Sequence, residues 1–328
     1  MAPPSVSSTP RRSFANIFGG SLAVPSGDEK SGASGRSSRR NSDLGSSTRQ
    51  TYVTPPGHQG NLSVDQKKAL DLISKQLEEA GAVSLQNPPH YQEAQLLRFL
   101  RARNFDVEAA RDMYLCAEEW KKTIGMDRLY SEFRFTERED VAKFGWRMYF
   151  HKTDTTGRPI FIQDLSGLDA EKVFSVTTPD RIIQNFAVTL EHAVRRRYYA
   201  CTKAQGHNVD DNYMVLNVQG LGLGQFWTMK NKLQELLTIL DNNFPELSGR
   251  VHIINAPFLF STAWSCIKGW LPAHTAEKIN ILGSDYMPVV SQYVDLDSWP
   301  AHLGGRCKCG HDSPQHACET RDPGPWNQ

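Results

Sequence analysis

The chain has 328 residues, 39% of them hydrophobic, which is enough for one large domain or two small ones with a substantial core. The formal net charge of +1 gives no general electrostatic reason to expect a nucleic-acid partner. Every long uncharged stretch is interrupted by Gly, Gln or Asn, so we expect any membrane contact to be peripheral. The absence of a secretory leader predicts a reducing compartment in which the six cysteines are free thiols.

Residues 1–60 are rich in Ser, Pro, Gly and Arg and have almost no periodic apolar pattern. Such a segment cannot bury enough surface to offset its chain entropy, which predicts a disordered, mildly basic tail. Arg39-Arg40-Asn41-Ser42 suits a basophilic kinase at Ser42, although an unmodified basic tail explains it equally well. The acid-free first 27 residues also permit a mitochondrial transit peptide, but the apolar face that such a peptide needs is nearly absent.

Residues 62–125 have the pattern of a small helical bundle. Asp106 is the expected N-cap of a helix whose apolar residues follow at helical spacing, and Gly125 is expected to end it. In the preceding helix the apolar stripe predicts burial of Leu96, Leu97 and Leu100, with the neighbouring arginines projecting elsewhere.

From about residue 140 short β-branched and aromatic runs alternate with helical stretches, which predicts a largely parallel sheet with crossover helices. Asp154-Thr155-Thr156-Gly157 is a turn signal that should join the first two strands as a hairpin. The expected helices cover residues 180–204 and 226–243. The expected strands are Trp146–Lys152, Pro159–Asp164, Tyr213–Val218, Arg250–Asn255 and Ile279–Leu282.

The segment after Pro257 is the most informative part of the chain. About four turns of expected helix carry almost only apolar side chains, with Lys268 as the single charge. Such a helix is too apolar for an ordinary wet surface and too short to span a bilayer, which requires roughly 20 apolar residues. It suits the lid of an apolar cavity that at times faces a membrane. The expected gate residues are Phe258, Phe260, Trp264, Ile267 and Trp270.

Several short motifs together resemble the CRAL-TRIO lipid-binding family, and within it the fungal phosphatidylinositol/phosphatidylcholine transfer proteins of the secretory pathway. The resemblance extends over residues 62–326. Besides the segment after Arg250, the motifs are Leu96–Arg103, His151–Asp154, Gly157-Arg158-Pro159, Phe244-Pro245-Glu246, Lys278-Ile279, Ile281-Leu282-Gly283, Gly304-Gly305 and Gly324-Pro325-Trp326.

This resemblance implies an α/β fold in which an N-terminal helical bundle precedes a mostly parallel mixed β-sheet. Crossover helices and the sheet would form a lipid cavity closed by a gate helix. We expect a helical N-terminal region at residues 61–126, a lipid-binding domain at 140–306 and a Cys-containing extension at 307–328.

The resemblance also implies a phosphodiester site built from cations and hydroxyls. Arg103 and Lys278 match the family's cationic headgroup contacts, and Thr275 matches a hydroxyl contact. Glu246 matches the acidic residue that supports the inositol-binding end. We expect Thr275 to cap a helix start, with Lys278 pointing the same way three residues later. Asn104 stands where relatives often carry a second cation, so one phosphate contact is expected to be lost.

The expected cavity wall consists of apolar side chains, each of which taken alone would read as ordinary core. In phosphatidylcholine-binding relatives two hydroxyl side chains line the central strand, and here Asn212 and Met214 occupy those positions. Met214 cannot donate a strong hydrogen bond, which argues against phosphatidylcholine and leaves a sterol, another phospholipid or another apolar molecule as the second ligand. The remaining wall residues are Phe161, Leu216, Phe226 and Ile253.

Motifs for catalysis are absent or incomplete. The glycine run Gly220–Gly224 resembles a dinucleotide-binding loop, but Gln225 stands where the third glycine is needed. Neither a Gly-x-Ser-x-Gly elbow nor a His-Glu-x-x-His motif occurs. We therefore predict a protein that is not an enzyme and needs no cofactor besides its bound phospholipid.

Cysteines and histidines gather near the C-terminus, which invites a zinc site, but their spacing is not that of a standard finger. The resemblance offers a competing explanation, because fungal and plant relatives commonly carry Cys-x-Cys, a later Cys and Gly-Pro-Trp here. We predict no metal and leave zinc as the alternative. The residues concerned are Cys307, Cys309, His311, His316 and Cys318.

These expectations combine into a cytoplasmic phosphatidylinositol transfer protein that acts peripherally at Golgi, endosomal or other membranes in vesicle trafficking. It would exchange phospholipid between membranes, present phosphatidylinositol to a lipid kinase, carry a second lipid and act as a monomer without nucleic acid. The alternative is a sensor or interaction module whose pocket holds a sterol or another apolar ligand.

Overall fold

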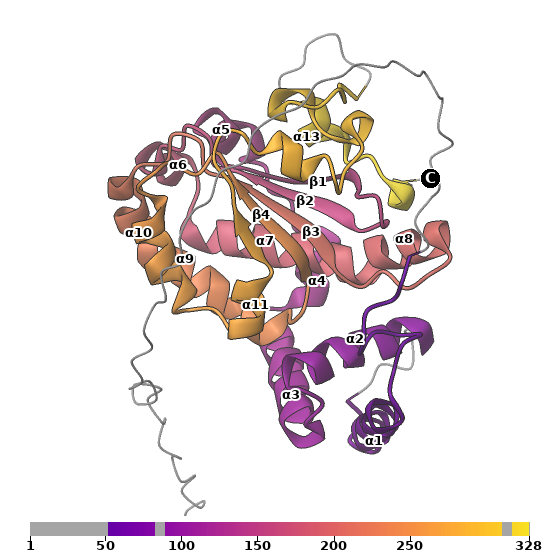
Figure 1. Cartoon of the computed structure of the whole chain (residues 1–328). Coiled ribbons are helices and arrows are strands. Elements are labelled where there is room, and N and C mark those ends of the chain that lie inside the picture. Colours follow the sequence, from indigo (N-terminus) through magenta and orange to yellow (C-terminus); the bar gives the residue numbers. More distant parts are fainter. Residues whose placement is uncertain (1–51, 83–88, 310–316, 328) are drawn as a thin grey trace, which may run out of the picture. The chain divides into compact units, whose positions relative to one another are not determined.

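The computed structural model describes residues 52–82, 89–309 and 317–327 (Figure 1). Most of the Ser/Pro/Arg-rich tail, including Ser42, lies outside the described residues, as do His311 and His316. For residues 1–51 the predictions of disorder and of phosphorylation therefore stay predictions. Residues 52–60, which the sequence also assigned to the tail, are instead held in place: Tyr52 stacks on His207, and Arg101 donates to the Gly57 carbonyl.

The first described helices form the predicted bundle. Ser63 opens the first helix with a capping box to Gln66, and Asp106 accepts from the Ala109 amide at the start of the third, as its position in the sequence predicted. The interhelical core is apolar and closed, with Ile73, Leu97 and Leu100 fully buried. The helices are α1 (Val64–Glu79), α2 (Pro89–Ala102), α3 (Val107–Thr123), α4 (Met126–Glu132) and α5 (Arg138–Lys143).

A five-stranded sheet in the order β1-β2-β3-β4-β5 follows. The first two strands are antiparallel and are joined at the predicted turn, where Gly157 adopts the left-handed φ of +90° that the turn requires. All other neighbours are parallel, which confirms the predicted mostly parallel sheet. The strands are β1 (Arg147–Thr153), β2 (Pro159–Asp164), β3 (Asn212–Asn217), β4 (Ser248–Ile254) and β5 (Ile279–Ile281).

Helices connect the parallel strands, as the βαβ pattern requires. The stretch predicted as one helix over 180–204 is interrupted by a π-helical segment. Its three consecutive arginines all have partners within the chain: Arg195 pairs with Glu191 and Asp127, Arg196 with the Trp326 carbonyl, and Arg197 with Asp322. The connecting elements are α6 (Ala170–Val176), α7 (Pro179–His192), the π-helix Ala193–Arg197, α8 (Tyr198–Gln205) and α9 (Leu223–Asn243).

Shorter elements complete the chain after β4. Helices α10 and α11 lie on the same side of the sheet as α9, whereas α13 lies on the other side (Figure 1). The elements are α10 (Phe260–Lys268), α11 (Ala273–Glu277), α12 (Met287–Val290), the 3-10 turns Leu296–Ser298 and Ala301–Leu303, α13 (Ala317–Arg321) and the 3-10 turn Pro325–Asn327.

Alternation along the strands assigns each side chain to one of two faces. On the face toward α13, which we call the rear face, Tyr149, Ile162 and Val215 pack with Trp299 in a closed core. On the opposite face, which we call the cavity face, alternate residues such as Met214 meet a hollow space. The two faces of one sheet thus have different functions in the fold.

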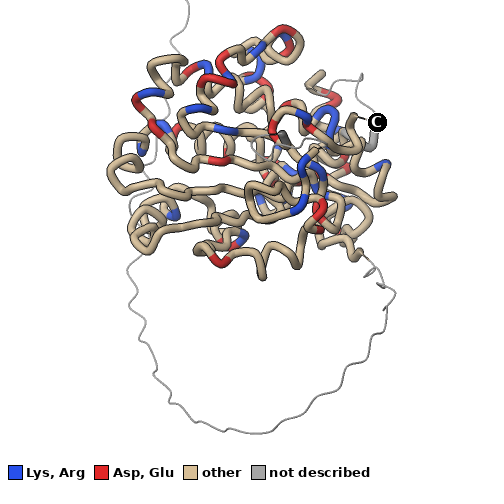
Figure 2. Tube along the Cα trace, turned by 90° about the horizontal axis from the view of Figure 1, so that it is seen from above, with Lys and Arg blue, Asp and Glu red and all other residues tan. Residues whose placement is uncertain are grey.

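None of the helices in the described ranges is long and apolar enough to cross a bilayer. Acidic and basic residues are interspersed along the trace rather than gathered into one field of a single sign (Figure 2).

Candidate functional site: an apolar cavity with a charged rim

A cavity that opens to solvent lies between the cavity face of the sheet and the helices that cover it. Its floor comes from alternate residues of β3 and β4, and its walls come from α7 and α9. The lining is predominantly apolar, which suits hydrocarbon rather than a polar metabolite. Apolar lining residues include Ile182, Phe186, Met214, Leu216, Val218, Phe226, Leu233, Leu237, Val251 and Ile253.

Short helix α10 covers one side of the cavity and directs Phe260 and Ile267 into it. The helix is shorter than the four turns that the sequence predicted. It begins only after the turn in which the Phe260 amide bonds the Pro257 carbonyl, and Gly269 caps its C-terminal end. Phe258 therefore precedes the helix and Trp270 follows it, and neither side chain lines the cavity. Trp264 is half-buried in the same apolar cluster without lining the cavity.

Large apolar side chains are exposed beside α10. Phe258 is 96% exposed, and Leu259 and Trp227 are at least half exposed. Lys230 lies 5.3 Å from the Trp227 ring centroid, so a cation accompanies the exposed aromatic ring.

At another part of the lining, cations surround the Glu246 carboxylate. Lys278 Nζ lies 2.8 Å from Glu246 Oε2, and His274 Nε2 lies 2.8 Å from Oε1. Arg101 Nε is 3.8 Å from the same carboxylate and also pairs with Asp210 at 3.0 Å. We call Glu246, Lys278, His274 and Arg101 the rim cluster.

Electrostatics in the rim cluster favour the ionised carboxylate. Burial raises the pKa of Glu246, but the charge and hydrogen bond of Lys278, together with Arg101 and His274, outweigh burial and lower the pKa overall. The backbone of Glu246 has a φ of 58°, a left-handed conformation that is uncommon for a residue other than glycine. Nearby, burial is the largest cause of a raised pKa at Asp241, against the opposing charge of Arg103.

Two members of the rim cluster follow from the sequence and two do not. Glu246 and Lys278 were expected together, whereas Arg101 was assigned to project away and His274 was not considered. Spacing offered a signal for His274, since it lies four residues before Lys278 across one helical turn. The contact of Arg101 joins α2 to the loop after α9 and has no local signal in the sequence.

Of the other two expected headgroup residues, Thr275 lines the cavity and Arg103 does not. Thr275 lines the cavity with Lys278, but it is the third residue of α11, whose N-cap position is Pro272, so it does not cap the helix. Arg103 is half-buried just after α2, where its guanidinium donates to the Ala102 carbonyl at 3.0 Å, and it does not line the cavity.

The expected wall residues divide between cavity and core. Met214, Leu216, Phe226 and Ile253 line the cavity. Phe161 does not: it is fully buried and stacks on the Phe150 ring at 4.6 Å, because the π-helical segment and its neighbours cover that end of the sheet. Asn212 is likewise fully buried outside the cavity lining.

The chain matches the CRAL/TRIO domain over residues 143–305 and the CRAL/TRIO N-terminal domain over residues 65–115. It therefore belongs to the CRAL/TRIO family, which confirms the resemblance seen in its motifs.

Curated relatives agree with this assignment. The Sec14 cytosolic factor of Schizosaccharomyces pombe is 34% identical over 274 residues, which are 84% of this chain and 92% of that protein. The SEC14 cytosolic factor of Kluyveromyces lactis is 33% identical over 272 residues, covering 83% and 88%. The phosphatidylinositol/phosphatidylcholine transfer protein SFH7 of Arabidopsis thaliana is 34% identical over 241 residues, which are 73% of this chain and 43% of that longer protein.

Among solved structures, the crystal structure of Sfh5 superimposes with a TM-score of 0.57 at 15% identity, covering 74% of this chain and 88% of that one. At this identity the match supports the fold alone, and it confirms the predicted arrangement of a helical region and a mostly parallel sheet.

Proposed function

We propose that the chain is a phospholipid transfer protein that holds an inositol lipid with its acyl chains in the cavity and its headgroup at the rim cluster. The observation that carries this proposal is the combination of an apolar cavity with a carboxylate-centred cluster of cations in its lining. Relatives that are named as phosphatidylinositol/phosphatidylcholine transfer proteins support it.

Energetics explain why the cavity must be apolar. Extracting a lipid into water costs about 0.8 kcal/mol per CH₂, on the order of 25 kcal/mol for two chains of about 16 carbons. A carrier works only when its interior nearly cancels that cost. The apolar walls from β3, β4 and α9 supply such an interior.

The rim cluster supplies the polar half of the site. Three cationic or protonatable groups surround one carboxylate, so the cluster has capacity left for an anionic phosphodiester. Glu246 can accept hydrogen bonds from inositol hydroxyls, and Thr275 can donate one to a phosphate oxygen. Arg103 lies outside the lining and would act through long-range charge, so Lys278 replaces it as the principal phosphate contact in this proposal.

Exchange requires an opening, and we assign it to α10. A nine-residue helix between Pro257 and Gly269 can move as a unit, and the exposed Phe258, Leu259 and Trp227 beside it can enter the membrane interface. The protein would act from the cytoplasm at Golgi or endosomal membranes, as a monomer, and would present its lipid to a lipid kinase. It needs no catalytic residue for these steps.

A vesicle assay tests the headgroup assignment. The paired substitution Glu246→Gln with Lys278→Ala removes both charges, so neither is left buried and unpaired. We expect transfer of labelled phosphatidylinositol between vesicles to fall at least tenfold, with an unchanged circular dichroism spectrum. The matched control is Lys75→Ala with Glu79→Gln, an exposed ion pair on α1 outside the cavity, which should transfer normally. Normal transfer by the first variant would refute the site.

A sterol or another single apolar ligand is the second candidate, and Met214 favours it. This side chain lies on the cavity floor, where it offers no strong hydrogen bond to a choline phosphate. Binding of labelled sterol that competes with phosphatidylinositol, combined with insensitivity to the rim substitutions, would favour the sensor function over transfer.

A further inference from the structure

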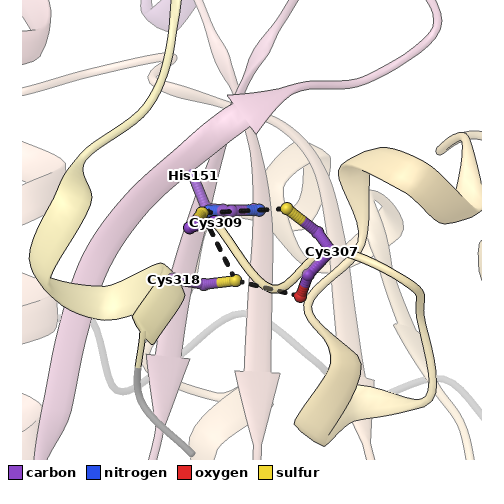
Figure 3. A group of neighbouring side chains, drawn as sticks. All are labelled: His151, Cys307, Cys309 and Cys318. Atoms are coloured by element: carbon purple, nitrogen blue, oxygen red, sulfur yellow. Dashed lines mark hydrogen bonds between the residues drawn. The ribbon is translucent and has the colours of Figure 1, made fainter. Parts of the chain in front are cut away.

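Four potential metal ligands converge on the rear face of the sheet, on the side opposite the cavity. They are His151 on β1, Cys307 and Cys309 after the last 3-10 turns of the domain, and Cys318 on α13 (Figure 3). One ligand atom from each lies within 4.8 Å of all the others. The grouping joins residues that are 158 positions apart in the chain, so local spacing did not reveal it.

Distances among these atoms fit a shared ion. Cys309 Sγ lies 3.7 Å from Cys307 Sγ and 3.6 Å from Cys318 Sγ. Two sulfurs bound to one tetrahedral zinc at about 2.3 Å would be roughly 3.8 Å apart. His151 Nδ1 is 4.0 Å from Cys309 Sγ, against roughly 3.6 Å expected for a nitrogen and a sulfur on the same ion.

Burial argues that the group is more than a set of small core residues. His151 is 0% exposed, Cys318 1% and Cys307 6%. His151 Nδ1 is the ring nitrogen near Cys309 Sγ, so a bound cation would use the lone pair of Nδ1 and leave the ring proton on Nε2.

A bound ion would have a structural role here, because it would attach the C-terminal extension to the sheet. Helix α13 has only five residues, too few for stability on its own, and it packs against β1. Other contacts also hold the described C-terminal residues, such as Trp326 in the core and the ion pair of Asp322 with Arg197. An ion held by β1, the 307–309 segment and α13 would fasten the extension to the sheet, as metals do in other small elements.

We propose that His151, Cys307, Cys309 and Cys318 form a structural Cys₃His zinc site. Four protein ligands leave no open position, so the site is structural rather than catalytic. The thiols bind as thiolates and release their protons on zinc binding. The proposal replaces our prediction from sequence that the chain binds no metal, and it does not depend on the identity of the lipid.

Metal analysis of the full chain, purified after expression with added zinc, tests the site. We expect about one zinc per chain by inductively coupled plasma mass spectrometry. The pair Cys307→Ser with Cys318→Ser should reduce zinc at least tenfold. The matched control is Cys116→Ser with Cys266→Ser, two thiols outside the group, which should keep one zinc. Zinc retained by the first pair, or absent from the unaltered chain, would overturn the proposal.

A second measurement remains valid even if the paired variant fails to fold. Cobalt(II) added to the metal-depleted unaltered chain should give the visible bands of tetrahedral thiolate coordination, and zinc should abolish them. Intact mass after alkylation without reductant should show free thiols in the metal-depleted chain. A disulfide between any two of the three cysteines, or the absence of the cobalt bands, would contradict the site. The Glu246→Gln, Lys278→Ala variant should keep its zinc even though it loses lipid transfer. The zinc proposal and the lipid proposal can therefore fail independently of each other.

Discussion

The two faces of the sheet carry similar apolar residues and yet differ in packing. On β3, Val215 points to the rear face and is fully buried, whereas its neighbours Met214 and Leu216 point to the cavity face and remain partly accessible. Behind the rear face Trp299 and its neighbours fill all the space, but opposite the cavity face α9 and α10 leave a hollow. Around the centre of β3, stability should therefore come mainly from the rear face, and ligand binding from the cavity face.

The largest effect should follow truncation on the rear face. Trp299 is fully buried, stacks near Tyr213 and donates its indole N–H to the Leu303 carbonyl at 2.6 Å. Trp299→Ala should lower the free energy of unfolding by about 3–5 kcal/mol, because it leaves a large void among buried side chains. Urea denaturation measures this change. A loss below about 1 kcal/mol would mean that the rear face is not the principal core.

The second largest effect on the free energy of unfolding should come from acid, through a histidine on the rear face. His252 is buried on β4, and burial followed by the charge of Arg250 lowers its pKa from 6.5 to about 4. The unfolded chain then binds a proton that the folded chain does not, so stability falls as the pH drops from about 6.5 to 4. The loss from this residue is at most about 3 kcal/mol.

A substitution isolates that contribution. Tyr213 donates to, or accepts from, His252 Nδ1 at 2.7 Å, and the Tyr293 ring also faces the imidazole. His252→Gln keeps a polar partner for Tyr213 and should flatten the pH dependence of unfolding between pH 6.5 and 4 by about one proton. An identical pH profile in the variant would show that folding does not shift the pKa of His252.

Adjacent truncations on β3 compare the two faces directly. Val215→Ala should cost about 2 kcal/mol of unfolding free energy, because the void it leaves is closed on all sides. Leu216→Ala removes more carbon but should cost less than about 1 kcal/mol in lipid-free protein, since its side chain already faces the cavity. Thermal and chemical unfolding of both variants provide the test, and the reverse order of costs would mean that the cavity is closed in solution.

The smallest effect on stability is expected at the exposed residues beside α10. Phe258→Ser with Leu259→Ser should change the free energy of unfolding by no more than about 0.5 kcal/mol, because both side chains are exposed. Vesicle binding and lipid exchange should nevertheless fall several-fold. Unchanged exchange would show that another surface contacts the membrane.

Local patterns predicted the elements well. The strand Pro159–Asp164 has the bounds that the sequence indicated, the Asp106 cap is present, and the turn at Gly157 joins an antiparallel pair. These features depend on alternation, capping and turn chemistry within a few residues, which a single sequence displays.

Features that depend on distant contacts were harder to predict. Phe161 and Met214 are register partners on β2 and β3, yet one lies in the closed core and the other lines the cavity, because different helices cover them. Both side chains are apolar, so hydrophobicity alone cannot tell a residue of the closed core from a residue that lines the cavity. The contact of Arg101 with Glu246 and the approach of His151 to three cysteines are likewise set by topology rather than spacing.

Mass spectrometry of lipids extracted from the purified full chain tests the central claim most directly. We predict about one inositol phospholipid per chain in the unaltered protein, and little in the Glu246→Gln, Lys278→Ala variant. An unaltered protein that carries only a sterol, or no lipid at all, would contradict the account.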